Sequence, residues 1–205
     1  MIVIEKLREE HGHVAEYLYF KATEAMRFAW WNFYTILFRF SCRFRHIKIG
    51  QDVHLIGRLV VAKYPSSTIV IGSVFFSTNS PTLSNAGYSS VNRIRTIRPS
   101  AKLVIGEGVE LNGVDISCRS KTISIGDQTK IASGCRIMDS DFHRIEPHLR
   151  DDPDIEGDAD VVIGQNCWLG TSCLVLKGSI IGNNTVVGAG SLVKGTLVAD
   201  SIYAG

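Results

Sequence analysis

The sequence predicts a mainly β fold in which short parallel strands wind into a three-sided column, preceded by an α-helical segment. The first observation is a six-residue repeat of aliphatic residues in the C-terminal half. The second is composition: 19 glycines and only 5 prolines in 205 residues indicate many tight turns without a disordered linker. The third is an apolar stripe of helical period near the N-terminus. This length suits one domain with a short helical addition.

The C-terminal repeat is the strongest indication of the column. Six aliphatic residues fall six positions apart without a slip: Ile163, Leu169, Val175, Ile181, Val187 and Val193. The residue after each is mostly glycine, and the residue four positions later is mostly small. A period of six fits neither an α-helix nor a simple hairpin array. It fits a prism in which each hexad gives one strand and one corner, with the aliphatic residue inward and three hexads in a coil of about 18 residues.

Two earlier blocks follow the same repeat less regularly. One block has two extra residues before its fourth member and contains Ile105, Leu111, Ser117, Ile125, Ile131 and Ile137. Ser117 is its weak member and depends on the register chosen. The other block contains Ile49, Leu55, Val61 and a poorer match at Ile71. We expect the column to occupy residues 47–205, interrupted by loops at 77–92 and 139–160. Loops on a rigid scaffold often carry function.

Residues 1–46 are expected to form a helical segment. Apolar residues from Leu7 onward lie close to a helical stripe, and the segment becomes dense in aromatic residues before three arginines: Arg39, Arg43 and Arg45. We favour a cap over the open first coil, because a solenoid needs capped ends. The alternative is a peripheral membrane anchor, with aromatic and arginine side chains at the headgroup level. The longest apolar stretch is shorter than the roughly 20 residues that a membrane span needs.

Charge and cysteine content limit the function classes. The formal net charge is +2, so bulk electrostatics do not indicate a nucleic-acid partner. The odd number of cysteines, with no CxxC pair and no secretion signal, indicates free thiols in a reducing compartment: Cys42, Cys118, Cys135, Cys167 and Cys173. We therefore expect a cytoplasmic protein, located at the inner face of the membrane if the helical segment is an anchor.

Three segments carry a resemblance to a known family. They are the Asp-Ser-Asp-Phe-His motif at 139–143, the run from Asp160 to Thr171, and the run from Val175 to Ser191. Together they resemble the hexapeptide-repeat O-acetyltransferases of bacterial surface-polysaccharide biosynthesis, which are related to the maltose and galactoside acetyltransferases. The resemblance covers roughly Ile47 to Gly205. It implies a left-handed parallel β-helix, a handedness that the repeat spacing alone does not give.

The resemblance also implies partners and site residues. The enzymes of this family are homotrimers that bind acetyl-CoA between neighbouring columns and acetylate a sugar or glycan acceptor. By resemblance, His143 is the general base, and Trp168 lines the site where acceptor and CoA bind. Asn112 lies near a position that contacts the acceptor. Backbone along the pantetheine arm corresponds to Gly170, Thr171, Gly188, Ala189 and Gly190. The family usually continues past its Ala-Gly with Asn-Pro-Ala and a basic helix; because this chain stops at Gly205, Lys177 and Lys194 become the candidates for the CoA phosphates.

The residues themselves suit acyl transfer to a hydroxyl. A neutral imidazole can remove the hydroxyl proton near neutral pH, and a carboxylate on its other nitrogen would fix the tautomer. Asp139 and Asp141 are the nearby candidates, and in an extended strand both would share one face with His143. We favour Asp141. His148 in the same loop either contacts the acceptor or is simply a loop residue. Trp168, outward beside Leu169, could equally be buried at a subunit interface.

The predicted function is therefore an acetyl-CoA-dependent O-acetyltransferase acting on a sugar hydroxyl, in the biosynthesis of O-antigen, capsule or exopolysaccharide. Three alternatives stay open. One is an amino-sugar N-acetyltransferase. Another is a metal-dependent hydratase of the γ-carbonic-anhydrase type, which needs three histidines around Zn²⁺; only His143 and His148 lie near one another, so no metal is expected. The last is a column that binds without catalysis.

Overall fold

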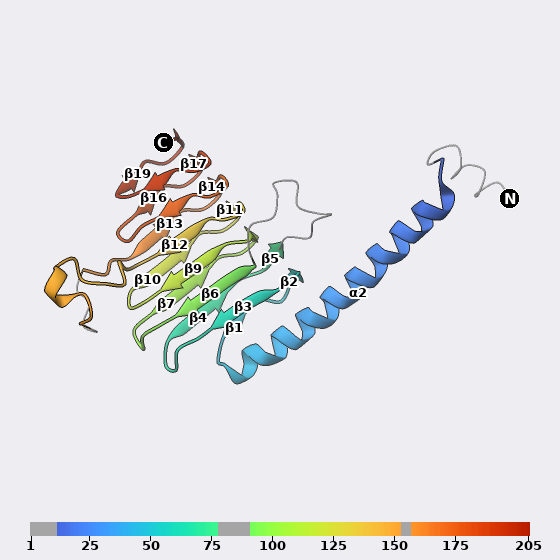
Figure 1. The fold of residues 1–205 in the computed structure, drawn as a ribbon, viewed down its shortest axis with the longest axis horizontal. Helices are drawn as coiled ribbons and strands as arrows, with labels where there is room; N and C mark the ends of the chain where they lie inside the picture. Colours follow the sequence, from blue (N-terminus) through green and yellow to red (C-terminus); the bar gives the residue numbers. More distant parts are fainter. Residues whose placement is uncertain (1–11, 78–90, 153–156) are drawn as a thin grey trace.

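The computed structural model describes residues 12–77, 91–152 and 157–205. Short strands wind into a three-sided column of parallel sheets, and one long helix leans against the first coil and extends away from the column (Figure 1). The sequence-based expectation of a mainly parallel β fold with an N-terminal helix is confirmed. Part of the expected loop 77–92 and the short stretch 153–156 lie outside the described residues.

Three parallel sheets form the three sides of the column. Sheet A contains, in spatial order, β1 (Lys48–Ile49), β4 (Thr68–Ile71), β7 (Lys102–Ile105), β10 (Thr122–Ile125), β13 (Val161–Ile163), β16 (Ile180–Ile181) and β19 (Thr196–Leu197). Sheet B contains β2 (His54–Ile56), β5 (Val74–Ser77), β8 (Val109–Asn112), β11 (Lys130–Ile131), β14 (Trp168–Leu169), β17 (Val186–Val187) and β20 (Ile202–Tyr203). Sheet C contains β3 (Leu59–Ala62), β6 (Asn92–Thr96), β9 (Asp115–Cys118), β12 (Arg136–Met138), β15 (Leu174–Val175) and β18 (Leu192–Val193).

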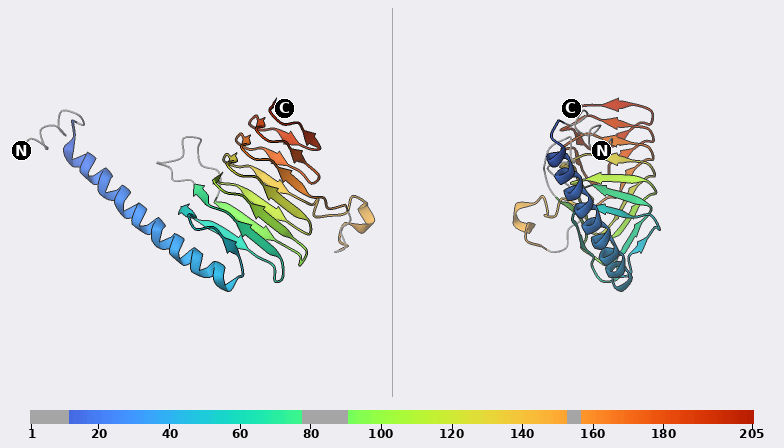
Figure 2. Two further views of the ribbon diagram at one scale, coloured as in Figure 1. Left: turned by 180° about the vertical axis from the view of Figure 1, so that it is seen from behind. Right: turned by 90° about the vertical axis from the view of Figure 1, so that its right-hand side faces the viewer.

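The chain visits the sheets in the fixed order A, B, C, so each strand pairs with the strand three later in sequence. Figure 2 shows the resulting stack of coils from two further sides. We name the three edges of the column by the sheets they join: the A–B, B–C and C–A corners. Because every segment between strands belongs to one corner, any residue outside a strand can be assigned to one edge of the column.

The repeat predicted from sequence forms the core. Ile163 stacks on Ile181, Leu169 on Val187, and Val175 on Val193, each pair one coil apart. All six side chains are buried. In the middle block the predicted Ser117 is wrong as the inward residue, because Ile116 is the residue that pairs with Ile137. Ile116 is fully buried and fills the core, whereas Ser117 lies one position on and accepts a hydrogen bond from Arg95 Nε at 2.7 Å.

Glycine after the aliphatic residue lets adjacent coils approach closely. A Cβ on Gly126 would lie 2.6 Å from the backbone of Gly164 and Gln165, and one on Gly170 would lie 2.6 Å from the nitrogen of Ala189. Real Cβ atoms do not come this near to backbone, so the stacking of the coils itself demands glycine at these positions. Gly170 therefore needs no ligand to explain it.

The five cysteines are all buried and free, as the sequence indicated. Cys135, Cys167 and Cys173 occupy inward corner positions and donate to backbone carbonyls of adjacent turns, Cys135 to Gly170 O at 3.0 Å and Cys173 to Gly188 O at 3.1 Å. Burial is the main cause that raises the pKa of Cys118, to about 12. These contacts account for the thiols as packing groups.

Helix α2 (Val14–Phe44) closes the open end of the column. Coil one has no preceding coil to pair with, and side chains of α2 and of its C-cap residue supply partners for its backbone. Thr35 Oγ1 accepts the N–H of Leu55 at 3.1 Å, the Tyr34 hydroxyl donates to Leu59 O at 3.1 Å, and Arg45 donates to Val61 O at 2.6 Å. Buried Phe38 and Cys42 join the core beneath them. Among the described residues, no helix is both long and apolar enough to cross a membrane.

Replacing Ile131 by alanine should destabilise the column, because this 2% exposed side chain stacks between Leu111 and Leu169. We expect the free energy of unfolding to fall by about 2–5 kcal/mol. Lys130→Ala, at the adjacent exposed position of the same strand, should cost less than about 1 kcal/mol. Urea unfolding measures both, and equal losses would contradict the inward–outward assignment.

Candidate active site at the C–A corner

The acidic loop leaves and re-enters the column at the C–A corner, between β12 and β13. The amide of Ala159 donates to the backbone oxygen of Asp139 at 3.1 Å, which closes the base of the loop. The described part of the loop contains one short 3-10 helix, η1 (Pro147–Leu149). Figures 1 and 2 show the loop projecting from the side of the column opposite to α2.

Asp139 anchors the start of this loop. Its side chain is fully buried, and its carboxylate accepts backbone N–H groups of the preceding coil from Arg119 at 2.6 Å, Ser120 at 3.0 Å and Lys121 at 2.8 Å. A carboxylate with these three partners has a structural task in the corner. The expectation that Asp139, Asp141 and His143 share one face is wrong: Asp139 points inward while the other two are exposed.

The turn that separates them is local. Phe142 has a φ of 63°, and its amide donates to Ser140 Oγ at 3.0 Å. A non-glycine residue in the left-handed region breaks the alternation of an extended strand. The Phe142 ring lies 5.7 Å from the guanidinium of Arg95, a cation–π contact that holds the turn against sheet C. The tight turn therefore carries His143 out to the surface of the corner.

The His143 ring is oriented by a backbone carbonyl instead of a carboxylate. Its Nδ1 lies 3.1 Å from the backbone oxygen of Arg150, across the loop. Because a carbonyl oxygen can only accept, Nδ1 donates in this contact, so the neutral form of the ring carries its hydrogen on Nδ1 and keeps the lone pair on Nε2. This is the tautomer that a general base requires. Neither candidate aspartate orients the ring in this structure.

A surface cavity of about 440 Å³ lies beside this ring. Its walls combine the imidazole, the Phe142 ring, three guanidinium groups and two carboxylates, from Ile97, Arg98, Arg119, Phe142, His143, Arg150, Asp151 and Asp152. Ile97, Arg98 and Arg119 come from the C–A corner of the two preceding coils, and the others come from the loop. The cavity therefore has one rigid wall on the column and one wall on the loop.

A buried ion pair supports the rigid wall. Arg119 Nη1 lies 2.8 Å from Asp158 Oδ2, and their side chains are only 8% and 3% exposed. The Ser120 hydroxyl donates to the same carboxylate oxygen. Burial acts to raise the pKa of Asp158, but hydrogen bonds and the charge of Arg119 outweigh it and hold the pKa below its ordinary value. The pair fixes the returning end of the loop against the corner.

Asp141 forms an ion pair with Lys177, with Oδ2 and Nζ 2.5 Å apart. Lys177 lies at the C–A corner one coil further along, and Lys194 lies at the same corner one coil beyond that. The two lysines proposed for CoA phosphates therefore line up on the edge of the column that carries His143. In this arrangement Asp141 tethers the loop to the next coil. Exposed His148 lies in η1 and does not line the cavity.

The remaining predicted residues lie elsewhere. Asn112, which ends β8, and four turn residues belong to the B–C corner: Gly170, Thr171, Gly188 and Ala189. Trp168 projects from sheet B and is 54% exposed. The side-chain oxygen of Asn112 is buried and has no hydrogen-bond partner among the residues that the structure describes. Within one chain, this second group is separated from His143 by the full width of sheet C.

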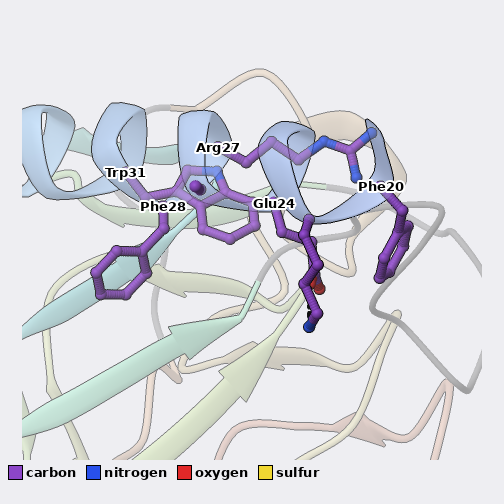
Figure 3. A pocket seen from close by; sticks show the side chains of 7 residues that line it. Phe20, Glu24, Arg27, Phe28 and Trp31 are labelled. Atoms are coloured by element: carbon purple, nitrogen blue, oxygen red, sulfur yellow. Dashed lines mark hydrogen bonds and ion pairs between the residues drawn. The ribbon is translucent and has the colours of Figure 1, made fainter. Parts of the chain in front are cut away.

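Another cavity, of about 400 Å³, lies along α2, on the other side of the column from the loop at 139–160 (Figure 1). Figure 3 shows its lining side chains, which in the described part of the chain all come from the helix and include Phe20, Phe28 and Trp31. It holds no group of residues suited to acyl transfer. Among the described residues, no group of three His, Cys, Asp or Glu side chains is placed to hold a metal ion.

Comparisons with known proteins agree with the repeat and the fold. Residues 160–195 match the family model described as bacterial transferase hexapeptide (six repeats). A comparison with curated protein sequences found no significant match. The match to the repeat and the fold of the structures below fit a left-handed winding of the column.

Two of the similar structures are variants of AntD, an N-acyltransferase from Bacillus cereus, in complex with dTDP-4-amino-4,6-dideoxyglucose and coenzyme A. Each is 15% identical to this chain, and each comparison covers 77% of this chain and 78% of that one, with TM-scores of 0.56 and 0.52. The polySia-specific acetyltransferase NeuO is 20% identical, with coverage of 77% and 72% and a TM-score of 0.48. The likeness to AntD shows a shared fold.

Sequence reasoning did not identify the arginines of the cavity or Asp158. Arg119 and Arg98 each follow a sheet C strand, so they share a corner with the loop. Counting corners coil by coil along the repeat would have placed both beneath His143. No sequence pattern pairs Asp158 with Arg119, since 39 positions separate them and the loop folds back to join them.

Asp139→Ala should destabilise the protein, because three backbone N–H groups lose their acceptor and each unsatisfied buried group costs about 1–3 kcal/mol. Asp141→Ala removes a partly exposed ion pair from the same loop and should cost less than about 1 kcal/mol. Chemical denaturation of the two variants measures the contrast. A stable Asp139→Ala protein would show that this carboxylate is not the anchor of the loop.

Proposed function

We propose that this protein transfers an acetyl group from acetyl-CoA to a sugar hydroxyl, with His143 as the general base. The observation that carries the proposal is the hydrogen bond from His143 Nδ1 to the backbone oxygen of Arg150, which in the neutral imidazole leaves the lone pair on Nε2, beside a cavity of about 440 Å³. The hexapeptide repeat and the fold shared with an acyltransferase support it. The resemblance of the motif at 139–143 to surface-polysaccharide O-acetyltransferases suggests a glycan acceptor.

The reaction needs one proton to move twice. Nε2 of His143 takes the proton of the acceptor hydroxyl as the hydroxyl oxygen attacks the thioester carbonyl of acetyl-CoA. The tetrahedral intermediate then collapses and breaks the carbon–sulfur bond. The sulfur leaves with the proton held by the imidazolium, which gives free CoA, an acetyl ester and a neutral His143. No covalent acyl-enzyme is required, and the buried cysteines have no part in the step.

The arrangement of the chain gives each neighbouring group a role in this proposal. Arg119, fixed by Asp158, supplies a rigid cationic wall for the acceptor. Asp141 holds the loop through Lys177, and Asp139 anchors it, so both act on the position of His143 and not on its proton. Lys194 and Lys177 follow His143 along one edge and would meet the CoA phosphates. The Nδ1 contact of His143 replaces the aspartate that the sequence suggested.

A second copy of the chain would complete the site. The groups expected to line the CoA arm lie on sheet B and the B–C corner, away from His143 of the same chain: Trp168, Gly170, Thr171, Gly188 and Ala189. Two columns packed side by side can bring the C–A corner of one next to the B–C corner of the other. This geometry favours the homotrimer implied by the family resemblance, with acetyl-CoA between columns.

His143→Ala should lower the rate of acetyl transfer by at least about 100-fold, because general-base catalysis contributes about 10²–10⁴-fold. CoA release is measured with acetyl-CoA and a panel of sugars, amino sugars and nucleotide sugars. His148→Ala is the matched control, since this histidine lies in the same loop but outside the cavity wall. Circular dichroism and thermal unfolding check that both variants keep the fold. Near-normal turnover by His143→Ala would contradict the role of His143 as the general base.

The same assay separates the rival functions. AntD shares the fold and is an N-acyltransferase, so transfer to an amino group is the closest rival. Mild alkali cleaves an acetyl ester but leaves an acetyl amide intact, which distinguishes O- from N-acetylation of the product. Metal analysis, with carbon dioxide hydration measured before and after chelation, tests the hydratase. Absence of acetyl transfer and of carbon dioxide hydration would indicate a column that binds without catalysis.

Mixing two inactive variants tests whether two copies form one site. Ala189→Trp should block the CoA groove from the B–C corner, because Ala189 is exposed there. Alone, this variant and His143→Ala should each lack activity. Chains co-expressed with different tags and purified as mixed assemblies should regain part of it, since one interface then combines an intact His143 with an intact Ala189. Mixed assemblies that stay inactive would contradict a shared site.

A further inference from the structure

One face of α2 is apolar along the whole helix and bare. At 3.6 residues per turn, these side chains fall within an arc of somewhat less than half of the circumference. All are exposed, and Arg43 at the edge is the one charged residue of α2 within the arc: Ala15, Leu18, Tyr19, Ala22, Ala25, Met26, Ala29, Trp30, Phe33, Ile36, Leu37, Phe40 and Phe44. We call this set the α2 stripe. Tyr19 is 73% exposed, and Trp30 and Phe40 are 64% and 63% exposed.

The α2 stripe points away from the column. The side chains that pack on coil one, Thr35, Phe38 and Cys42, lie on the opposite side of the helix. Figures 1 and 2 show that the N-terminal half of α2 extends clear of the strands, with open space beyond its outer side. A flat surface could therefore contact the full length of the stripe, about 45 Å at 1.5 Å per residue, without meeting the column.

We propose that the α2 stripe lies in the interface of an anionic lipid membrane and holds the protein on that surface. The charge of the helix suits such a surface. From Val14 to Arg45 there are five basic residues, Lys21, Arg27, Arg39, Arg43 and Arg45, against two acidic ones, Glu16 and Glu24. Arg39 and Arg45 donate to the backbone of coil one and Lys21 pairs with Glu24, so these three add to the electrostatic attraction without contacting lipid. Arg43 is exposed at the border of the stripe, so its guanidinium can reach lipid phosphates.

The shape of the stripe favours lipid over another helix. A coiled-coil seam is narrow and uses only two positions in seven, whereas this stripe is broad. Bulky aromatic rings run along it: the ring centroids of Trp30 and Phe33 lie 5.9 Å apart, and those of Phe40 and Phe44 lie 4.8 Å apart. Tyr19 and Trp30 lie at its border, where an aromatic ring with a polar tip suits the level of the lipid headgroups.

The other side of the same helix provides a matched control. Phe20 and Phe28 are 47% and 64% exposed, but they project from the side of α2 that faces the column, where they line the cavity of Figure 3. A membrane beneath the α2 stripe would not touch them. The same charged substitution can therefore be made on either face, at Phe33 and Phe40 or at Phe20 and Phe28. A difference in membrane binding between the two pairs then reports which face contacts the membrane, and not the effect of replacing Phe by a charged residue.

The experiment is co-sedimentation of the full chain with vesicles. The wild type should bind vesicles that contain phosphatidylglycerol, and bind less to pure phosphatidylcholine. Phe33→Asp with Phe40→Asp should weaken binding to the anionic vesicles by at least about tenfold, because two apolar anchors are replaced by charges of the wrong sign. Phe20→Asp with Phe28→Asp should bind as the wild type does. Thermal unfolding confirms that both double variants are folded.

Three results would overturn the proposal. The first is that the wild type stays in the supernatant with anionic vesicles. The second is that both double variants lose binding equally. The third is a fall in molecular mass of the Phe33→Asp, Phe40→Asp variant in lipid-free solution, measured by light scattering. That fall would show that a second copy of the chain covers the stripe. Neither readout uses enzymatic activity, so the proposal stands or fails separately from acetyl transfer.

Discussion

The stacking of one inward aliphatic side chain on its equivalent one coil away is the constraint on which the whole molecule depends. Ile125 lies between Ile105 and Ile163 in sheet A, and the same layering runs through the other two sheets. Each coil also satisfies the backbone of the next, so strands of two residues are sufficient. Every coil stacks in the same register on the one before it. The close approach of neighbouring coils therefore requires glycine at the turns and small residues at the corners, whatever the function of the protein.

A corner is the place where such a column can gain a loop without losing its core. The loop at 139–160 leaves and returns at one corner, and Ile137 and Val161 on either side keep their inward positions. Asp139 satisfies the backbone of the coil below, and the Arg119–Asp158 pair closes the returning end. The rigid column thus provides one wall of the cavity, and the loop adds the imidazole, with its tautomer set by the carbonyl of Arg150.

The N-terminal helix covers the open end of the column. Coil one exposes unpaired backbone, and Thr35, Tyr34 and Arg45 provide hydrogen bonds that a preceding coil would otherwise make. Only one face of α2 is needed for this task. The cap and the proposed membrane contact do not exclude each other, because the side chains that pack on coil one and the exposed α2 stripe lie on opposite faces of the helix.

The sequence alone determined the column, because a six-residue period of inward aliphatic residues cannot be buried in any other regular way. It also singled out His143 through the motif around it. Two features depend on the path of the backbone through the loop and could not be predicted from the sequence. One is the turn at Phe142, a residue with positive φ, between inward Asp139 and outward His143. The other is the contact between Arg119 and Asp158. Nor could the sequence show that the expected site residues divide between two corners. Periodicity records which way each strand residue points, whereas a loop's path is decided by tertiary contacts between residues far apart in the chain.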